Sequence, residues 1–252
     1  MRAGGRVPRV SARAAPAREE PPILAAPRRA AVTAGVLAAL TAAVFAAAAG
    51  RGALGHVQHL DDAWLRLMIS GRTPPLTAVA KVFNVLGLVY VTLPVRLAVA
   101  GYLAFRRRWW HLAAFAGAVL LSEILIGPVK TVYDRPRPPG SLVATSGASF
   151  PSGHAIAASV TVFAAVIALV PPGRRRVAWG AAAAVFAVLM AASRAYLGAH
   201  WLSDAVAGLL LGTTCALLAA VPVDQAERAW RRRRALRAGD AHEAIRPADD
   251  LR

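Results

Sequence analysis

The chain has 252 residues, 57% of them hydrophobic, with a mean hydropathy of +0.47 and a formal net charge of +17. This apolar composition is unusual for a soluble domain. The charge alone is typical of nucleic-acid binding, but the arginines cluster at the two ends and in short breaks between apolar runs, where they set membrane topology. We therefore expect the bilayer, and no nucleic acid, as a partner.

The chain order predicts an all-α fold. Residues 1–28 are rich in Pro, Arg and Ala and have no apolar core, which indicates a disordered basic tail. Six apolar segments follow, each near the ~20 residues that a membrane span needs. They cover residues 30–49, 84–105, 109–128, 154–171, 177–193 and 203–222. The sequence thus predicts a six-transmembrane helix bundle over residues 29–222, followed by a basic tail, 223–252.

The connection between the first two spans contains HVQHLDDAWLRLMIS, residues 56–70. Its apolar residues recur with a helical rhythm, which predicts an interfacial helix. The stretch also holds the only candidate metal ligands that we find: His56, His59, Asp61 and Asp62. We interpret these four as the polar face of that helix and predict no metal and no cofactor.

The arginines also predict an orientation. With six spans, both tails and the connections Arg106–Arg108 and Arg174–Arg176 fall on one side, which the positive-inside rule makes cytoplasmic. We expect a multi-pass plasma-membrane protein with cytoplasmic termini. The remaining connections then face outward: residues 50–83, 129–153 and 194–202.

The first of three polar stretches is KTVYDRPRPPG, residues 130–140. Lys130, Arg135 and Arg137 are cations on the side where the positive-inside rule disfavours them. The prolines end any helix there. A snorkelling lysine beside a solvated loop is an equally good reading of this stretch alone.

The second stretch is FPSGHAIAAS, residues 150–159. Ser152 or Gly153 is placed to cap the following helix, whose free N–H groups and dipole favour an anion, with His154 at the same mouth. An ordinary cap with an interfacial histidine is the alternative.

The third stretch is SRAYLGAHWLSD, residues 193–204. His200 and Asp204 are four residues apart and would share one helix face, so the carboxylate can hold one imidazole N–H and leave the other nitrogen free. Arg194 offers a fork suited to phosphate oxygens. The alternative is an Arg–Asp pair that caps two helices.

All three stretches fall on one predicted face, and their cations, histidines and carboxylate suit phosphoryl transfer. Their order resembles the three signature motifs of the type 2 phosphatidic acid phosphatase family, whose superfamily includes vanadium haloperoxidases and bacterial acid phosphatases. The resemblance covers about residues 55–222. It rests on Lys130-x6-Arg137-Pro138, Pro151-Ser152-Gly153-His154 and Ser193-Arg194-x5-His200-x3-Asp204.

The resemblance implies a role for each matched residue. His200 would attack phosphorus and form a phosphohistidine, Asp204 would orient it, and His154 would protonate the leaving group. The phosphate would be held by Lys130, Arg137, Ser152, Gly153 and Arg194. Family members of this kind need no metal. Arg135 and Tyr133 lie outside the signature, and their roles stay open.

The function that follows is hydrolysis of a lipid phosphate or diphosphate at the outer face. Candidate substrates are phosphatidic acid, phosphatidylglycerophosphate and polyprenyl diphosphate. Alternatives are lipid-to-lipid phosphotransfer on the same site, or a catalytically silent lipid-binding or transport protein; six spans argue against a haloperoxidase. Within the spans, Arg96 and Glu123 need partners. We predict that they pair with each other or that Glu123 meets a site cation.

Overall fold

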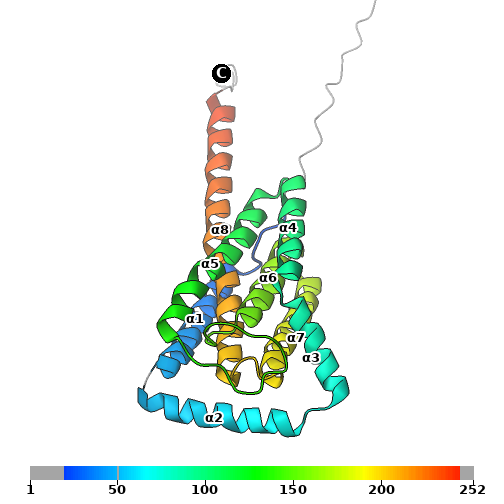
Figure 1. The fold of residues 1–252 in the computed structure, drawn as a ribbon. Coiled ribbons are helices and arrows are strands. Elements are labelled where there is room, and N and C mark those ends of the chain that lie inside the picture. Colours follow the sequence, from blue (N-terminus) through cyan, green and yellow to red (C-terminus); the bar gives the residue numbers. More distant parts are fainter. Residues whose placement is uncertain (1–19, 50, 245–252) are drawn as a thin grey trace, which may run out of the picture.

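The computed structural model describes residues 20–49 and 51–244, and its helices account for all the regular secondary structure within them, as predicted. They are α1 (Pro27–Ala49), α2 (Arg51–Ser70), α3 (Pro74–Leu86), α4 (Val89–Phe105), α5 (Trp109–Tyr133), α6 (Gly153–Leu169), α7 (Arg174–Tyr196) and α8 (Leu202–Ala244). Helix α8 packs against α1, α5 and α6, and α6 also packs against α5 and α7. Helix α2 lies across one end of this bundle, and α8 extends beyond the other (Figure 1).

Among the described residues, four helices are long and apolar enough to cross a membrane: α1, α5, α7 and α8. Helices α3 and α4 qualify only together, as one span bent by 52°. Helix α6 is apolar but has 17 residues, fewer than a straight span normally uses. The chain is therefore a multi-pass membrane protein with four or five candidate spans, and the count of six stays a prediction. The place of α2 at a membrane interface is likewise a prediction.

The second predicted span, residues 84–105, is not one continuous helix. Helix α3 ends at Leu86, Gly87 caps it, and Leu88 is extended before α4 begins at Val89. The apolar pattern runs through this break without a change, so hydropathy could not locate it. The bend is important for the site, because it brings Gly87 against His154, as described below.

The two ends of the bundle carry different residues. The connections with Arg106–Arg108 and Arg174–Arg176 lie at the end where α8 extends, whereas the 134–152 connection and the α7–α8 turn lie at the end crossed by α2 (Figure 1). This separation supports the predicted grouping of arginines on one side, opposite the three polar stretches.

The predicted tails need correction where the structure describes them. Residues 20–26 are not disordered: Ile23 and Leu24 are buried, the Leu24 N–H donates to Asp224 Oδ1 at 3.0 Å, and Arg228 donates to the Leu24 carbonyl at 2.7 Å. The predicted C-terminal tail continues α8 as far as Ala244. The rest of the predicted tails, residues 1–19 and 245–252, lie outside the described residues.

The intramembrane charges pair with each other, as one of the two predictions had it. Arg96 Nη1 donates to Glu123 Oε1 at 2.7 Å, and Arg96 Nε donates to Thr161 Oγ1 at 2.9 Å. These contacts join α4, α5 and α6. Because an isolated charge in a bilayer is costly, the pair stabilises this three-helix contact.

A close approach between α8 and α6 fixes the start of α6. A Cβ atom on Gly208 would lie 2.6 Å from the Ser152 carbonyl oxygen and 3.0 Å from Ala155 Cβ, so only glycine fits. The Ser152 N–H also donates to the Asp204 carbonyl oxygen at 3.0 Å. The PSGH stretch is thereby held directly against the helix that carries Asp204.

Candidate active site

The elements that carry the predicted site residues meet at the end of the bundle that α2 crosses (Figure 1). These residues come from the end of α5, the 134–152 connection, the start of α6, the end of α7 and the turn into α8. In that order they are Lys130; Arg137; Ser152, Gly153 and His154; Arg194; and His200 and Asp204. Lys130 and Asp204 are 74 positions apart in the sequence. They share one region because α5 and α7 end there and α6 and α8 begin there.

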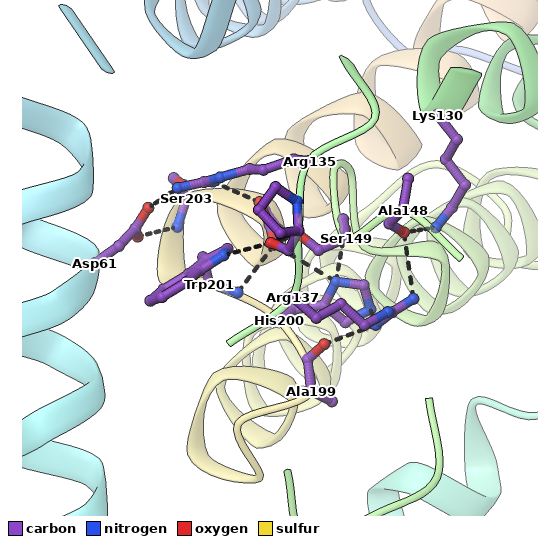
Figure 2. Close-up of polar contacts among 12 residues, drawn as sticks. Asp61, Lys130, Arg135, Arg137, Ala148, Ser149, Ala199, His200, Trp201 and Ser203 are labelled. Carbon is purple, nitrogen blue, oxygen red and sulfur yellow. Dashed lines mark hydrogen bonds and ion pairs between the residues drawn. The ribbon is translucent and has the colours of Figure 1, made fainter. Parts of the chain in front are cut away.

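Arg137 is the link between the first and third stretches. Its Nη1 donates to the Ala199 carbonyl at 2.7 Å and lies 3.2 Å from His200 Nε2. Its other nitrogens donate to carbonyls of the 134–152 connection, including Gly147 at 2.9 Å. Lys130 Nζ donates at 2.7 Å to the Ala148 carbonyl, which Arg137 also contacts at 3.3 Å (Figure 2). Arg137 therefore lies beside His200, and Lys130 meets Arg137 at the Ala148 carbonyl.

The hydrogen bonds of His200 define its tautomer. Nδ1 lies 2.7 Å from the Ser149 carbonyl oxygen, which can only accept, so Nδ1 carries the proton. Nε2 then carries the lone pair and accepts a hydrogen bond from Arg137 Nη1 at 3.2 Å. Burial, with a smaller effect of Arg137 and Arg194 and against the charge of Asp204, lowers the pKa of His200 from 6.5 to about 4. At neutral pH, His200 is therefore an uncharged imidazole.

Asp204 does not hold His200 by the direct hydrogen bond that the spacing predicts. The distance from His200 Nδ1 to Asp204 Oδ2 is 3.7 Å, which is too long. Helix α8 begins only at Leu202, so the two residues do not stack as on a regular helix. Ser149 lies between them: its hydroxyl donates to Asp204 Oδ2 at 2.7 Å, and its carbonyl accepts from His200. Asp204 therefore orients the imidazole through Ser149.

Three buried side-chain atoms at the start of α6 and the end of α7 have no hydrogen-bond partner. Ser152 occupies the N-cap position of α6 without capping it, and its buried Oγ has no hydrogen-bond partner. The same holds for His154 Nε2 and Arg194 Nε, although Arg194 Nη1 donates to Asn84 Oδ1. Buried polar groups are normally paired, so three unpaired atoms on neighbouring elements point to a ligand that pairs them. The first-turn N–H groups of α6 add anion-binding capacity at the same place.

Several residues that sequence reasoning did not place belong to this site. Asp61, read from the sequence as interfacial polarity, is only 2% exposed and pairs with Arg135 at 2.7 Å. Arg135 also pairs with Asp204 at 2.6 Å. Tyr133, whose role was open, lies outside this group of contacts: it donates to the Phe45 carbonyl at 2.7 Å and packs on Phe150. The charged character of Asp61 and Arg135 was visible in the sequence, but their pairing across 74 residues was not.

Within the described part of the chain, no three His, Cys, Asp or Glu side chains lie close enough to hold a metal ion. Of the four candidates on the 56–70 stretch, Asp61 faces Arg135, Asp62 accepts from Gln58 Nε2 at 2.9 Å, and His59 is exposed. The His56 side chain lies outside the described residues.

The family of the chain follows from comparisons with known proteins. Residues 109–227 match the PAP2 superfamily. Phosphatidylglycerophosphatase B of Bacillus subtilis is 32% identical over 165 residues, which cover 62% of this chain and 79% of that protein. The chain belongs to the PAP2 superfamily. The family resemblance of the three motifs is thereby confirmed, and the relatives indicate a phosphatase.

Two solved structures are similar to this PAP2 chain. One is a transmembrane PAP2-type phosphatidylglycerolphosphate phosphatase from Bacillus subtilis, with a TM-score of 0.62 and 28% identity, covering 74% of this chain and 93% of that one. The other is LpxE of Aquifex aeolicus, with a TM-score of 0.51 and 25% identity, covering 62% and 91%. These relatives support a membrane phosphatase that acts on a lipid phosphate.

The Gly87–His154 contact provides a steric test. A Cβ atom on Gly87 would lie 2.3 Å from His154 Cδ2 and 2.9 Å from Cγ, so Gly87→Ala must displace the whole imidazole. The family resemblance implies that His154 is the general acid, and a positioned general acid contributes ~10²–10⁴-fold, so we expect kcat to fall at least about 10-fold. Gly101→Ala is the matched control, since nothing lies within 4 Å of its added Cβ. Equal turnover by the two variants in detergent would show that His154 is not held by this contact.

The lowered pKa of His200 predicts the acid limb of the pH profile. Below its pKa the imidazole is protonated and loses the nucleophilic lone pair, so activity falls as the pH falls through that value. We expect kcat/KM, corrected for ionisation of the substrate phosphate, to have its limb near pH 4. A limb near the ordinary value of 6.5 would mean that the histidine which titrates is not the buried His200.

Proposed function

We propose that this PAP2 protein hydrolyses a lipid phosphate or diphosphate through a phosphohistidine on His200, without a metal ion. The observation that carries the proposal is the neutral His200, whose Nε2 accepts a hydrogen bond from Arg137 at 3.2 Å. His154 and Arg194 lie close enough to His200 for their charges to interact, and each has an unpaired buried nitrogen, as Ser152 has an unpaired Oγ. This is the arrangement expected around an attacked phosphorus atom: a nucleophile on one side and donors for the equatorial oxygens around it.

In the first step, His200 Nε2 attacks phosphorus, an N–P bond forms, and the P–O bond to the lipid breaks. The electron pair of that bond leaves on the lipid oxygen, which takes a proton from the imidazolium form of His154. The negative charge of the bound phosphate favours this form, and loss of the proton leaves His154 neutral. Lys130, Arg137 and Arg194 balance the charge of the phosphoryl oxygens, and Ser152 Oγ and the Gly153 N–H donate to them. Asp204 stabilises the positive phosphoimidazole through Ser149.

In the second step, His154 accepts a proton from water, and the water oxygen attacks the phosphohistidine. The N–P bond breaks, its electron pair returns to Nε2, and inorganic phosphate leaves. All the groups that these steps require are side chains or backbone N–H groups of the chain itself. The steps are therefore expected to continue in the presence of a chelator.

The location of the site supports a lipid substrate at the outer face of the plasma membrane. The site lies at the end of a bundle of apolar helices, opposite the arginine-rich end that the positive-inside rule makes cytoplasmic (Figure 1). A head group can reach this end while its chains stay in the bilayer.

The test is phosphate release in detergent micelles containing EDTA, with phosphatidic acid, phosphatidylglycerophosphate and undecaprenyl diphosphate offered separately. Release from at least one lipid is expected, and the preferred lipid identifies the substrate class. Absence of release from all three by folded protein would contradict hydrolysis. Loss of release on addition of EDTA would contradict metal independence alone.

A further inference from the structure

Helix α2 contributes a buried carboxylate to the region of the nucleophile. Asp61 is 2% exposed, and both of its oxygens are occupied. Oδ1 accepts from the Ser203 N–H at 2.8 Å, and Oδ2 accepts from Ser203 Oγ at 2.6 Å and from Arg135 Nη2 at 2.7 Å (Figure 2). Since Ser203 directly precedes Asp204, Asp61 holds both the backbone beside Asp204 and the cation that pairs with it.

Arg135 bridges the two carboxylates. Its Nη1 donates to Asp204 Oδ1 at 2.6 Å and to Ser203 Oγ at 2.7 Å, while Nη2 faces Asp61 and Gln58. Arg135 is 8% exposed, and its guanidinium carbon lies 5.5 Å from the centroid of the Trp201 ring. A planar fork held from both sides in this way has one orientation only.

The charges of this group matter for catalysis as well as for packing. Two carboxylates share one guanidinium, so the group carries one net negative charge beside His200. That charge favours the positive phosphoimidazole over the neutral imidazole. Without the Asp61 charge, Arg135 would neutralise Asp204 alone, and Nη2 would keep only Gln58 as its partner. Both changes weaken the hold of Asp204 on Ser149 and His200.

We propose that Asp61 is a positioning residue for the phosphatase reaction, and that it acts on Asp204 through Arg135. The proposal rests on the function proposed above. It makes α2 a part of the active site, although α2 carries none of the signature motifs. Asp61 contacts neither the nucleophile nor the residues proposed to hold the phosphate, so its effect belongs in kcat and not in substrate binding.

The first experiment compares Asp61→Asn with Asp62→Asn. Asn at 61 keeps one acceptor for the Ser203 N–H but places an amide or an uncharged oxygen opposite Arg135. Asn at 62 keeps the acceptor that Gln58 uses. We expect Asp61→Asn to lower kcat about 10- to 100-fold, as loss of an orienting partner does, with KM changed less than about 3-fold. Asp62→Asn stays within about 2-fold of wild type, and Asp61→Glu recovers part of the loss.

A double-mutant cycle separates positioning from folding. If Asp61 acts through Asp204, adding Asp61→Asn to Asp204→Asn lowers kcat no further. The same loss in both backgrounds, or a loss that follows the fraction of folded protein, would overturn the proposal. If Asn at 61 prevents folding, Arg135→Lys tests the same claim, because lysine keeps the charge but cannot bridge both carboxylates. Turnover by Arg135→Lys equal to wild type would also overturn it.

Orthovanadate binding, measured by thermal shift, tests the role of Asp61 without requiring that any lipid be hydrolysed. Vanadate mimics the phosphoryl transition state, so Asp61→Asn should weaken its binding about 10-fold even if the natural lipid is none of those offered. One possible result is that the wild type releases phosphate while Asp61→Asn and Asp62→Asn have equal turnover and equal vanadate affinity. This result overturns only the positioning role. Absence of release from every lipid, with vanadate binding still dependent on Asp61, overturns the proposed hydrolysis and supports the positioning role.

Discussion

Replacement of His200 by asparagine is expected to reduce kcat by about 10⁴- to 10⁶-fold, because it removes the nucleophile itself. We expect the substitution to change the stability of the fold little. The asparagine amide can donate to the Ser149 carbonyl, as His200 Nδ1 does at 2.7 Å, but it offers no counterpart to Nε2. The measurement is phosphate release from the preferred lipid in detergent, with folding checked by thermal unfolding.

His59→Asn is the control for this prediction, since His59 is exposed on α2 and takes no part in the site. It should retain wild-type turnover. Turnover by His200→Asn within about 10-fold of wild type would exclude His200 as the nucleophile, because a tenfold change is only about 1.4 kcal/mol of the barrier.

The second large effect is expected from Arg137→Lys, which preserves charge and removes the planar fork. Arg137 donates to the carbonyls of Ser146, Gly147 and Ala199 and contacts His200 Nε2. Lysine cannot make these bonds and still face a phosphate, so the 134–152 connection and the oxyanion donors both lose their positions. We expect kcat/KM to fall about 10²- to 10³-fold, as on loss of one charge-stabilising donor.

The comparison for Arg137→Lys is Arg174→Lys, an equally conservative change at an exposed position on the opposite end of the bundle. It should leave kcat/KM unchanged. If Arg137→Lys were as active as Arg174→Lys, a point charge would suffice at position 137 and the fork geometry would not contribute.

The sequence predicted the parts of the fold that depend on local composition. Helix α5 begins at Trp109 as expected, and the partnership of Arg96 with Glu123 followed from the cost of isolated charges in a bilayer. The break at Gly87 was missed because Leu88 and Val89 continue the apolar run, so nothing in hydropathy marks it. The packing of Ile23 and Leu24 was missed because it depends on Asp224 and Arg228, about 200 residues away.

For the site, the sequence predicted where the residues lie but not how they are connected by hydrogen bonds. The motifs placed Lys130, His154 and His200 at one end of the bundle, because their spans end there. They did not show that Ser149, and not a direct bond, connects Asp204 to His200. That connection arises from the fold of the 134–152 connection, which has no periodic pattern to read. The role of Asp61 was not predicted, because a polar residue on an amphipathic helix normally faces water.

The most direct measurement is rapid-quench trapping of the covalent intermediate with lipid substrate that carries a radiolabelled phosphate. The mechanism predicts an acid-labile, base-stable label on the protein, up to one per site, that maps to the peptide containing His200 and is absent from His200→Asn. Phosphate release at the wild-type rate without such a label, or with the label on another residue, would contradict the phosphohistidine mechanism.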